Sequence, residues 1–453
     1  MPEPEQGNRN LSTYLDVSGP HHMRVPWHEA LSEPGRPAVD APLADKVSVI
    51  MRTGQLALSA GDSAWRVRDF MNRVAHVLGV TVHADISLVN IEATCIEGSR
   101  SITEVVANPT AGVNTERVML LEHYLHEVEA LGREISVGAF HDLLDVVESK
   151  GQRYRPWQSG LASGLACGSF VFLLGGGPVE MAGAALGAGF GQLARRVVAG
   201  RRINQFVAVA CGVAVACVAY LLSLMAMSPW VPDAMSHEAG YIGAMLFVIP
   251  GFPLITSGFD LFQSEMRSGI ERLAYALTVI LTGTAVGWLV ATGVRLYPDD
   301  FAPLGLGPVP LTALRALFSF VGVYGFSVMF NSTPRMCATA ASIGAVANTL
   351  RLSLTGFWSV PPEAAALAGA FVAGLLAAAC KVRTSIPRTA VTVPSIVIMV
   401  PGLYMYRAVY YMGTFQPTDA VDWLIRAAMI VVFLPIGLIA ARVITDPRWR
   451  RVS

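Results

Sequence analysis

The sequence predicts a mostly α-helical membrane protein, in which ten transmembrane helices form a 5+5 inverted repeat behind a small cytosolic α+β domain. Charged residues make up only 15% of the 453 residues, against roughly 25% in a soluble domain. The deficit lies after residue 156, where ten apolar segments follow one another, and two of them contain a Pro-Gly pair at matching places. We therefore expect a disordered polar tail over 1–44, the α+β domain over 45–155, and transmembrane repeats over 156–296 and 297–453, the second with a basic cytosolic C-terminus.

The α+β domain is predicted from a change of period along the chain. Apolar residues first recur at helical spacing, then alternate with polar residues as in half-buried strands, and then return to helical spacing. In chain order we expect helix 46–60, a helix from the N-cap Asp62 to Leu78, strands 80–86, 91–95 and 102–106, and helices 115–131 and 137–149. The last helix should continue through Arg155 into the first membrane span.

The ten apolar segments are long enough to be membrane spans. They cover residues 157–175, 179–194, 204–227, 239–260, 270–294, 309–330, 336–353, 363–380, 390–412 and 423–442. The second and seventh are expected to be short, and they are rich in glycine, alanine and serine. Small residues of this kind allow helices to pack closely in a membrane.

The charges between the segments predict an orientation. Every second connection is basic, and the others are acidic. The basic ones hold Arg153 and Arg155, 195–202, Arg267 and Arg272, Arg335, 381–388, and finally Arg442, Arg448, Arg450 and Arg451; the acidic ones hold Asp233 and Glu238, Asp299 and Asp300, Glu363, and Asp419 and Asp422. Because basic loops stay in the cytosol, both termini should be cytosolic in the plasma membrane of a bacterium.

The fourth and ninth segments are poor helices. The fourth reads VIPGFPLITSGFD from residue 248, and the ninth reads IVIMVPGLYMYRAVYYM from residue 396, so Pro401-Gly402 follows Pro250-Gly251 by 151 residues. Proline removes a helix hydrogen bond, and broken backbone at membrane depth is tolerated only inside protein or beside a water-filled cavity. Since five spans is an odd number, the second half should enter the membrane from the opposite side. Inverted repeats with broken helices are typical of secondary transporters, so we expect the breaks to line a pathway.

Four stretches resemble the threonine/serine exporter family: SAGDSAWRVRDFMNRVAHVLG (59–79), NPTAGVNTERVMLLEHYLHEVEALG (108–132), VIPGFPLITSGFD and VPGLYMY. The resemblance covers most of residues 45–440. It implies a soluble domain joined to ten spans and proton-driven export of L-threonine and L-serine, and it implies that some members split the two halves into separate proteins. One departure is Arg68, where many relatives have an acid, so no role of that acid is carried over.

Together, the breaks and the resemblance predict a substrate site. Its residues are Pro250, Gly251, Pro253, Thr256, Ser257, Asp260, Pro401, Gly402, Tyr404, Tyr406 and Arg407. Backbone amides at the half-helix N-termini suit a carboxylate, Thr256 and Ser257 suit a substrate hydroxyl, and Asp260 is the candidate for proton coupling, with Arg407 as its partner charge. Each has a simpler alternative: Asp260 could mark the end of a span, Arg407 could be an interfacial residue, and the tyrosines could form an aromatic belt.

Other functions are less consistent with the sequence. It has no GxxxxGK[ST] loop for ATP, no GxSxG or HExxH motif, and six cysteines without a zinc pattern, so we expect no enzyme activity, catalytic residue, cofactor, metal or nucleic-acid partner. The partners should be an amino acid, protons and the lipid bilayer, and a homo-oligomer remains open. Two alternatives stay open: a passive amino-acid channel, and a membrane-anchored hydrolase using acids and bases such as His123, His126 and Glu127. Glu180 is expected to be a solvated loop acid.

Overall fold

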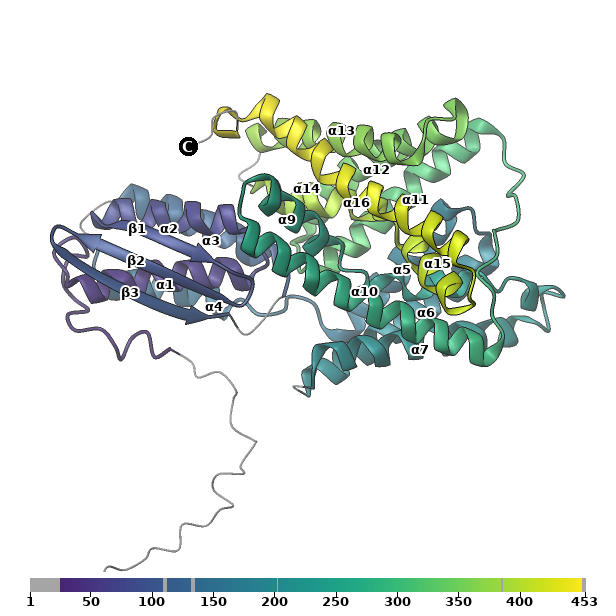
Figure 1. Cartoon of the computed structure of the whole chain (residues 1–453), viewed down its shortest axis with the longest axis horizontal. Helices are drawn as coiled ribbons and strands as arrows, with labels where there is room; N and C mark the ends of the chain where they lie inside the picture. The colour runs from purple at the N-terminus through teal and green to yellow at the C-terminus, as the bar shows by residue number, and fades with distance from the viewer. Residues whose placement is uncertain (1–24, 109–111, 132–134, 202, 384–385, 450–453) are drawn as a thin grey trace, which may run out of the picture.

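The computed structural model describes residues 25–108, 112–131, 135–201, 203–383 and 386–449, in which an α+β domain lies beside a larger helical body (Figure 1). The domain consists of α1 (Leu43–Ser59), α2 (Ala64–Leu78), strands β1 (Thr81–Ile86), β2 (Asn90–Glu97) and β3 (Arg100–Ala107), α3 (Thr115–Leu131) and α4 (Val137–Ser149). The strands form an antiparallel sheet in the order β1-β2-β3. All the predicted elements of the domain are therefore confirmed.

The domain core forms because one face of the sheet is apolar. Ile86, Ile91, Ala93, Cys95 and Val106 are buried and lie in the same cluster as the apolar faces of the helices. One detail differs from the expectation: the residue before α2 is Ser63 rather than Asp62. The Asp62 carboxylate accepts a hydrogen bond from the Ser63 amide, at 3.0 Å, just before the helix starts.

Residues 25–42, expected in the disordered tail, instead pack on the domain. Trp27 is buried and stacks on His141 with ring centroids 6.2 Å apart. The amides of Ser32 and Glu33 donate to the buried carboxylate of Asp45. A large apolar side chain and a buried acceptor thus fix this stretch, while residues 1–24 of the expected tail lie outside the described residues.

The helical body contains a helix or bent helix pair in every predicted apolar segment. These are α5 (Pro156–Leu174), α6 (Pro178–Gly200), α7 (Gln205–Met227), α8 (Gly240–Met245) with the short helix η4 (Leu246–Val248) and α9 (Gly251–Phe262), α10 (Met266–Val294), α11 (Pro308–Met329), α12 (Pro334–Trp358), α13 (Pro362–Arg383), α14 (Arg388–Ile396) with η5 (Val397–Met399) and α15 (Gly402–Gly413), and α16 (Pro417–Thr445). Among the described residues, six helices are long and apolar enough to cross a membrane, or up to eight if each bent pair is one span.

Two expectations about these helices are wrong. The helices of the second and seventh segments are not short, because α6 has 23 residues and α12 has 25, although neither is among the described helices that are apolar enough to cross. Their glycines do not end the helix but bring a neighbour close. A Cβ on Gly187 would lie 2.7 Å from the carbonyl oxygen of Ala216 in α7, as expected of small residues between packed helices. Helix α4 ends at Ser149 and does not continue into α5. A continuous helix is disfavoured there because Pro156 pushes the residue before it, Arg155, out of the helical conformation.

The helical body has two ends, which we name by what they contact. The domain end carries the α9–α10 turn (263–265) and the α11–α12 turn (330–333), both of which contact the α+β domain. The far end carries the α5–α6 turn (175–177) and the α10–α11 connection (295–307). The chain finishes its described part at the domain end, where Trp449 packs on Trp65 with centroids 5.4 Å apart; Arg450 and Arg451 lie outside the described residues.

Candidate functional site

The two Pro-Gly breaks have the same backbone conformation. Pro250 has φ −81° and ψ 62°, and Pro401 has φ −81° and ψ 55°. Each proline is the centre of an inverse γ-turn, in which the amide of Gly251 donates to Ile249 O and the amide of Gly402 to Val400 O, both at 2.8 Å. The helices on the two sides of each turn are bent by 57° and 47°. Neither break is therefore an ordinary proline kink within one helix.

The elements around the breaks also match in length. Helices α9 and α15 each have 12 residues and begin at the glycine, and α10 and α16 each have 29. The turn after each half-helix contains a non-glycine residue with positive φ, Ser264 at 62° and Phe415 at 58°. The interval of 151 residues between the prolines thus holds for the turns and helices that follow them.

The breaks cross each other and are packed through their glycines. A Cβ on Gly251 would lie 2.4 Å from Cγ2 of Val397, in the turn before the second break. A Cβ on Gly402 would lie 2.3 Å from Cδ1 of Ile249 and 2.8 Å from Cδ2 of Leu246, before the first break. Only glycine permits this approach of backbone to side chain.

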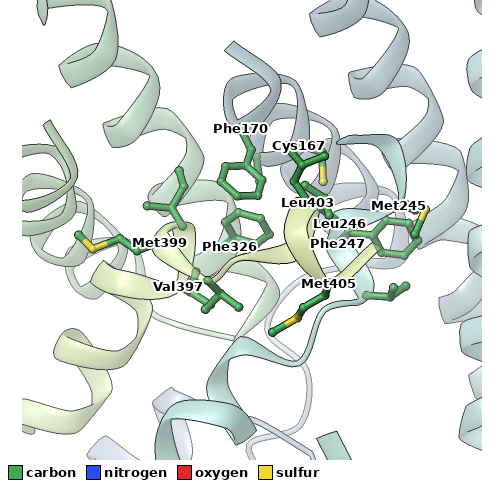
Figure 2. Close-up of a cluster of buried hydrophobic side chains, with 14 of the residues drawn as sticks. Cys167, Phe170, Met245, Leu246, Phe247, Phe326, Val397, Met399, Leu403 and Met405 are labelled. Atoms are coloured by element: carbon green, nitrogen blue, oxygen red, sulfur yellow. The ribbon is translucent and has the colours of Figure 1, made fainter. Parts of the chain in front are cut away.

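Apolar side chains fill the space around this crossing. Figure 2 shows Leu246 and Phe247 of the first break and Val397 and Met399 of the second gathered near two phenylalanines. These are Phe170 of α5 and Phe326 of α11, whose rings meet edge to face with centroids 6.5 Å apart. In this conformation the crossing is a closed, apolar contact, so a substrate pathway through it requires the two broken helices to separate.

Thr256 and Ser257 are buried on α9. The Thr256 hydroxyl donates to Phe252 O at 3.0 Å, and the Ser257 hydroxyl donates to Leu254 O at 2.8 Å. Pro253 lies in the first turn of the same helix and also offers its carbonyl to Thr256. Because a hydroxyl that donates can still accept, both could receive a hydrogen bond from a substrate.

Asp260 is fully buried, but it lies at the domain end and not at the break. It follows Gly251 by nine residues of α9, which is about 13 Å of helix. Its carboxylate accepts from the Ala64 amide at 2.8 Å and from the Ser268 hydroxyl at 3.1 Å, and Arg272 Nε lies 3.2 Å away. A carboxylate against the first turn of α2 is favoured by the helix dipole. Asp260 therefore connects α9 to the α+β domain.

The cation beside Asp260 is Arg272, and not Arg407 as we predicted. It is buried and also donates to Asp62 O at 2.9 Å. The sequence showed Arg272 only as one of the charges of a basic loop. What distinguishes it is burial by the α+β domain, which is remote in sequence.

Tyr404, Tyr406 and Arg407 lie on the half-helix that leads to the far end. The Tyr406 hydroxyl bonds to the Tyr241 hydroxyl at 2.7 Å, with both residues fully buried, so it joins α15 to α8. The Tyr404 ring packs on Trp423, with centroids 5.0 Å apart. Arg407 is also buried, and its Nη2 donates to Asp300 Oδ1 at 2.7 Å and to the carbonyls of residues 298 and 299. Tyr406 is therefore not part of an aromatic belt, whereas Arg407 extends to the far-end connection, as an arginine near the end of a span would.

Glu180 is not the solvated acid that we expected. It is buried at the start of α6, where one carboxylate oxygen accepts from the Gly177 amide at 3.0 Å. The other lies 2.6 Å from His237 Nδ1. No sequence pattern indicates this pair, because His237 lies in the connection before α8, 57 residues from Glu180.

The α+β domain contacts both halves of the helical body. On the first half, Arg68 binds Glu265 through two hydrogen bonds of 2.9 and 2.8 Å. On the second half, the Thr115 hydroxyl bonds to the Ser332 hydroxyl at 2.7 Å, and Asn331 donates to Asn114 Oδ1 at 2.9 Å. Arg68, the departure noted in the sequence, is thus a docking residue.

In the described part of the domain, the acids and bases that the hydrolase alternative would use are either exposed or bound to other partners. His123 and His126 are exposed on α3 and lie near Glu127 and Glu129. His141 is buried with its Nε2 3.0 Å from the Ser48 hydroxyl, yet its Nδ1 faces Arg52 Nη1 at 3.1 Å. Because arginine can only donate, Nδ1 accepts and Nε2 carries the hydrogen, so His141 cannot take a proton from Ser48. Burial lowers the pKa of His141 to about 4.

A possible metal site is also weak. His28, Asp142 and Asp145 offer ligand atoms within 4.8 Å of one another. His28 already bonds to Asp145 at 2.8 Å, and Arg52 binds the same carboxylate. These ion pairs occupy His28 and Asp145, two of the three members of the cluster.

Comparison with known proteins identifies the family. The family described as "Putative threonine/serine exporter" matches residues 48–295, and a second one, "Threonine/Serine exporter, ThrE", matches residues 315–444. The chain belongs to the threonine/serine exporter family. It is therefore a multi-pass membrane protein of a transporter family, as the four motifs predicted.

Relatives of the family carry two kinds of name. The "Probable threonine/serine exporter" of Mycobacterium tuberculosis (strain H37Rv) is 22% identical over 422 residues, 88% of this chain and 76% of the relative. The "Probable succinate transporter subunit YjjP" of Escherichia coli (strain K12) is 26% identical over 251 residues, 53% of this chain and 91% of the relative. Its namesake from Klebsiella aerogenes is 26% identical over 52% of this chain and 88% of its own length. No solved structure matches the chain.

Proposed function

We propose that this exporter-family protein is a secondary active exporter of small amino acids of the threonine/serine class, coupled to protons. The observation that carries the proposal is the crossing of the two Pro-Gly breaks, where two half-helices of equal length begin at glycines packed on each other's turns. Half-helix N-termini at one place offer amides to a substrate carboxylate. The hydroxyls of Thr256 and Ser257 lie one to two turns further along α9.

The proposed architecture is ten spans in two inverted halves, with the domain end in the cytosol. Its support is the match of turns and helices at an interval of 151 residues, together with the charges. Arg267 and Arg335 lie at the domain end, while Asp233 and Asp299 lie on far-end connections, which is the distribution that the positive-inside rule requires. Helices α6 and α12 would complete the ten: neither is among the described helices apolar enough to cross on their own, but each is long enough and packs through small residues.

The proposed coupling group is Asp260. A buried carboxylate bound to Arg272 and to the α2 amide holds the domain against α9. Protonation would remove the charge attraction to Arg272 and weaken these bonds. Proton binding would then loosen the α+β domain from the first half, which makes the domain a controller of access rather than an enzyme.

Efflux from preloaded proteoliposomes tests the function. L-Threonine, L-serine and succinate should be loaded separately, with and without an acidic exterior. We expect efflux of threonine and serine against a gradient, driven by the pH difference. Flux that is only downhill and does not depend on pH would support the channel alternative. Efflux of succinate alone would indicate the substrate that the relatives named as succinate transporter subunits suggest. No efflux of any of the three would overturn the proposal.

Asp260→Asn tests the coupling. We expect it to abolish pH-driven uphill export while counterflow exchange persists, because the site at the breaks is separate from Asp260. Ser268→Ala is a matched control, since it removes one hydrogen bond to the same carboxylate without changing a charge. Normal uphill export and normal pH dependence in Asp260→Asn would reduce Asp260 to a docking residue.

The two family regions of the chain bear on how the transporter is assembled. A relative named as a transporter subunit is matched over 91% of its length by about half of this chain, while this chain carries both family regions. We therefore propose that one chain supplies both parts, with homo-oligomers as a further level of assembly. Mass measurement of the purified protein in detergent reports the number of copies directly.

A further inference from the structure

A cavity at the far end reaches the second break from outside the helix crossing. It has a volume of about 420 Å³ and is lined by the end of α5 (172–175), the connection 300–306, Leu311 and Arg315 of α11, and Leu403 and Arg407 of α15. Leu403 is the second residue of α15, directly after Pro401-Gly402. A volume of a few hundred Å³ suits a small metabolite.

The charged side chains that line this cavity are two arginines and one acid, Asp300. The Asp300 side chain is 91% exposed, whereas that of Arg407 is 7% exposed, so water competes with Arg407 for the Asp300 carboxylate. The Arg315 guanidinium donates to the Leu352 carbonyl at 3.3 Å and lies over the Phe357 ring at 5.8 Å. The lining therefore favours an anion.

Arg407 is the more deeply buried of the two arginines in this lining. The residue is 6% exposed, and its described hydrogen bonds all leave from Nη2. Its Nε is buried without a hydrogen-bond partner. The same guanidinium lies over the Trp423 ring at 4.8 Å, and a buried guanidinium nitrogen without an acceptor is costly, so Arg407 is held in place with part of its hydrogen-bonding capacity unmet. The amide of Leu403, in the first turn of α15, has no acceptor within its own helix and adds the positive end of the helix dipole.

We propose that this cavity binds the carboxylate group of a small organic anion, through Arg315, Arg407 and the first turn of α15. The proposal rests on the proposed transport function and deepens it, since it gives the pathway a carboxylate site on the side opposite the α+β domain. The ligand could be an amino-acid zwitterion or a dicarboxylate. Both present the same carboxylate to the arginines, and the two are distinguished below.

Binding to the purified full chain in detergent tests the site, with L-threonine and succinate as separate probes in isothermal titration and thermal-shift measurements. We expect at least one probe to bind the unaltered chain and to bind Arg315→Gln roughly tenfold or more weakly, because a charge-assisted hydrogen bond is lost. Arg315→Lys should keep part of the affinity. Threonine alone identifies the zwitterion, and succinate alone identifies the dicarboxylate.

Two further variants make the result interpretable. Arg335→Gln removes the same charge from an exposed residue at the start of α12, and it should bind normally. Arg407→Gln should lose binding too, but Arg407 also holds the connection 298–300, so Arg315 is the decisive position. Binding by neither probe, or equal binding by Arg315→Gln and Arg335→Gln in folded protein, overturns the site.

The outcome is separable from that of the proposed function. Efflux with Arg315-independent binding would retain the exporter and reject this cavity as its carboxylate site. Arg315-dependent binding without efflux of any probe would retain the site and reject export. Each result therefore bears on one proposal alone.

Discussion

At the scale of single residues, burial decides what each charge does. Asp260 and Asp300 are both acids near the ends of helices, yet Asp260 is fully buried against Arg272 and a backbone amide, while the Asp300 side chain is 91% exposed. A buried charge needs partners, and removing one of them is strongly destabilising. Protonation of Asp260 would therefore weaken buried contacts between α9 and the α+β domain, whereas protonation of Asp300 would change little.

His141 makes stability depend on pH. Its folded-state pKa is lowered from 6.5 to about 4 by burial and then by the charge of Arg52, so the unfolded chain binds a proton between these values and the folded chain does not. Stability should thus be full above pH 6.5 and fall as pH is lowered toward 4, by about 1.4 kcal/mol per pH unit at most. Thermal unfolding between pH 7 and pH 4 measures it.

The control for this prediction is His141→Gln, which cannot take up the proton. We expect the variant to be less stable at pH 7, because Ser48 and Arg52 lose a partner, but to lose less stability than the unaltered chain on acidification. Equal slopes for the two proteins would mean that other groups cause the acid sensitivity.

At the scale of elements, the two breaks form one structural unit. Each begins with an inverse γ-turn at a proline and continues as a 12-residue half-helix, and each glycine is covered by a side chain from the other break. The two residues of each Pro-Gly pair thus have different roles: proline fixes the turn, and glycine lets the partner element approach. Neither residue acts alone.

Alanine at the two glycines tests this unit. In Gly251→Ala the new methyl meets Val397 Cγ2 at 2.4 Å, and a β-branched side chain cannot easily rotate away. In Gly402→Ala it meets the flexible ends of Ile249 and Leu246. We expect overpacking to cost about 1–3 kcal/mol in Gly251→Ala and less in Gly402→Ala, measured by thermal unfolding in detergent.

Gly293→Ala in α10 is the matched control, because nothing lies within 4 Å of its added Cβ. It should be neutral or slightly stabilising, since alanine favours helix. If all three variants have the same stability, the close approach at the crossing is not as tight as the structure has it.

At the scale of the whole molecule, the α+β domain bridges the two halves. It binds the α9–α10 turn of the first half through Arg68 and the α11–α12 turn of the second through Thr115. A domain that contacts both halves at one end resists their separation there. On the proposed function, this contact has to loosen in each transport cycle.

A reversible cross-link tests that requirement. The Thr115 and Ser332 hydroxyl oxygens are 2.7 Å apart, so Thr115→Cys with Ser332→Cys should form a disulfide under oxidising conditions. Cys337, whose thiol contacts Ser332 O, is replaced by serine in all samples. We expect the oxidised protein to stop efflux and the reduced protein to recover it, while each single variant exports normally. Full efflux with the bond formed would make the domain a static anchor.

Orientation can be measured with single labels at the two ends. Cys95 is fully buried and cannot report it, so we choose the exposed positions Ser101 in β3 and Ser236 before α8. A membrane-impermeant maleimide should label Ser236→Cys but not Ser101→Cys in intact cells, and the reverse in inside-out vesicles, with the unaltered chain as background. The opposite pattern would invert the proposed topology.

Much of the fold could be predicted from the sequence, because its signals are local. The hydrophobic periodicity predicts the helices and strands of the α+β domain, the apolar segments predict the helices of the helical body, and the Pro-Gly pairs locate both breaks. Helices α6 and α12 are longer than the apolar segments inside them, because α6 continues past Arg195 and Arg196 and α12 continues past Arg351. Apolar length predicts the part of a helix that lipid or protein can cover, but not how far the helix continues beyond it.

The sequence by itself determined the order of elements, the breaks and the family of this protein. Only the tertiary structure decided which charges meet: Asp260 with Arg272 and the start of α2, Arg407 with the connection at residues 298–300, and Glu180 with His237. These partners come from elements far apart in the chain, and they are selected by burial, because a charge removed from water is stable only where the fold supplies an opposite charge or a hydrogen bond. Helix period carries no information about which charges become partners. The packing of the α+β domain against the two halves decides it.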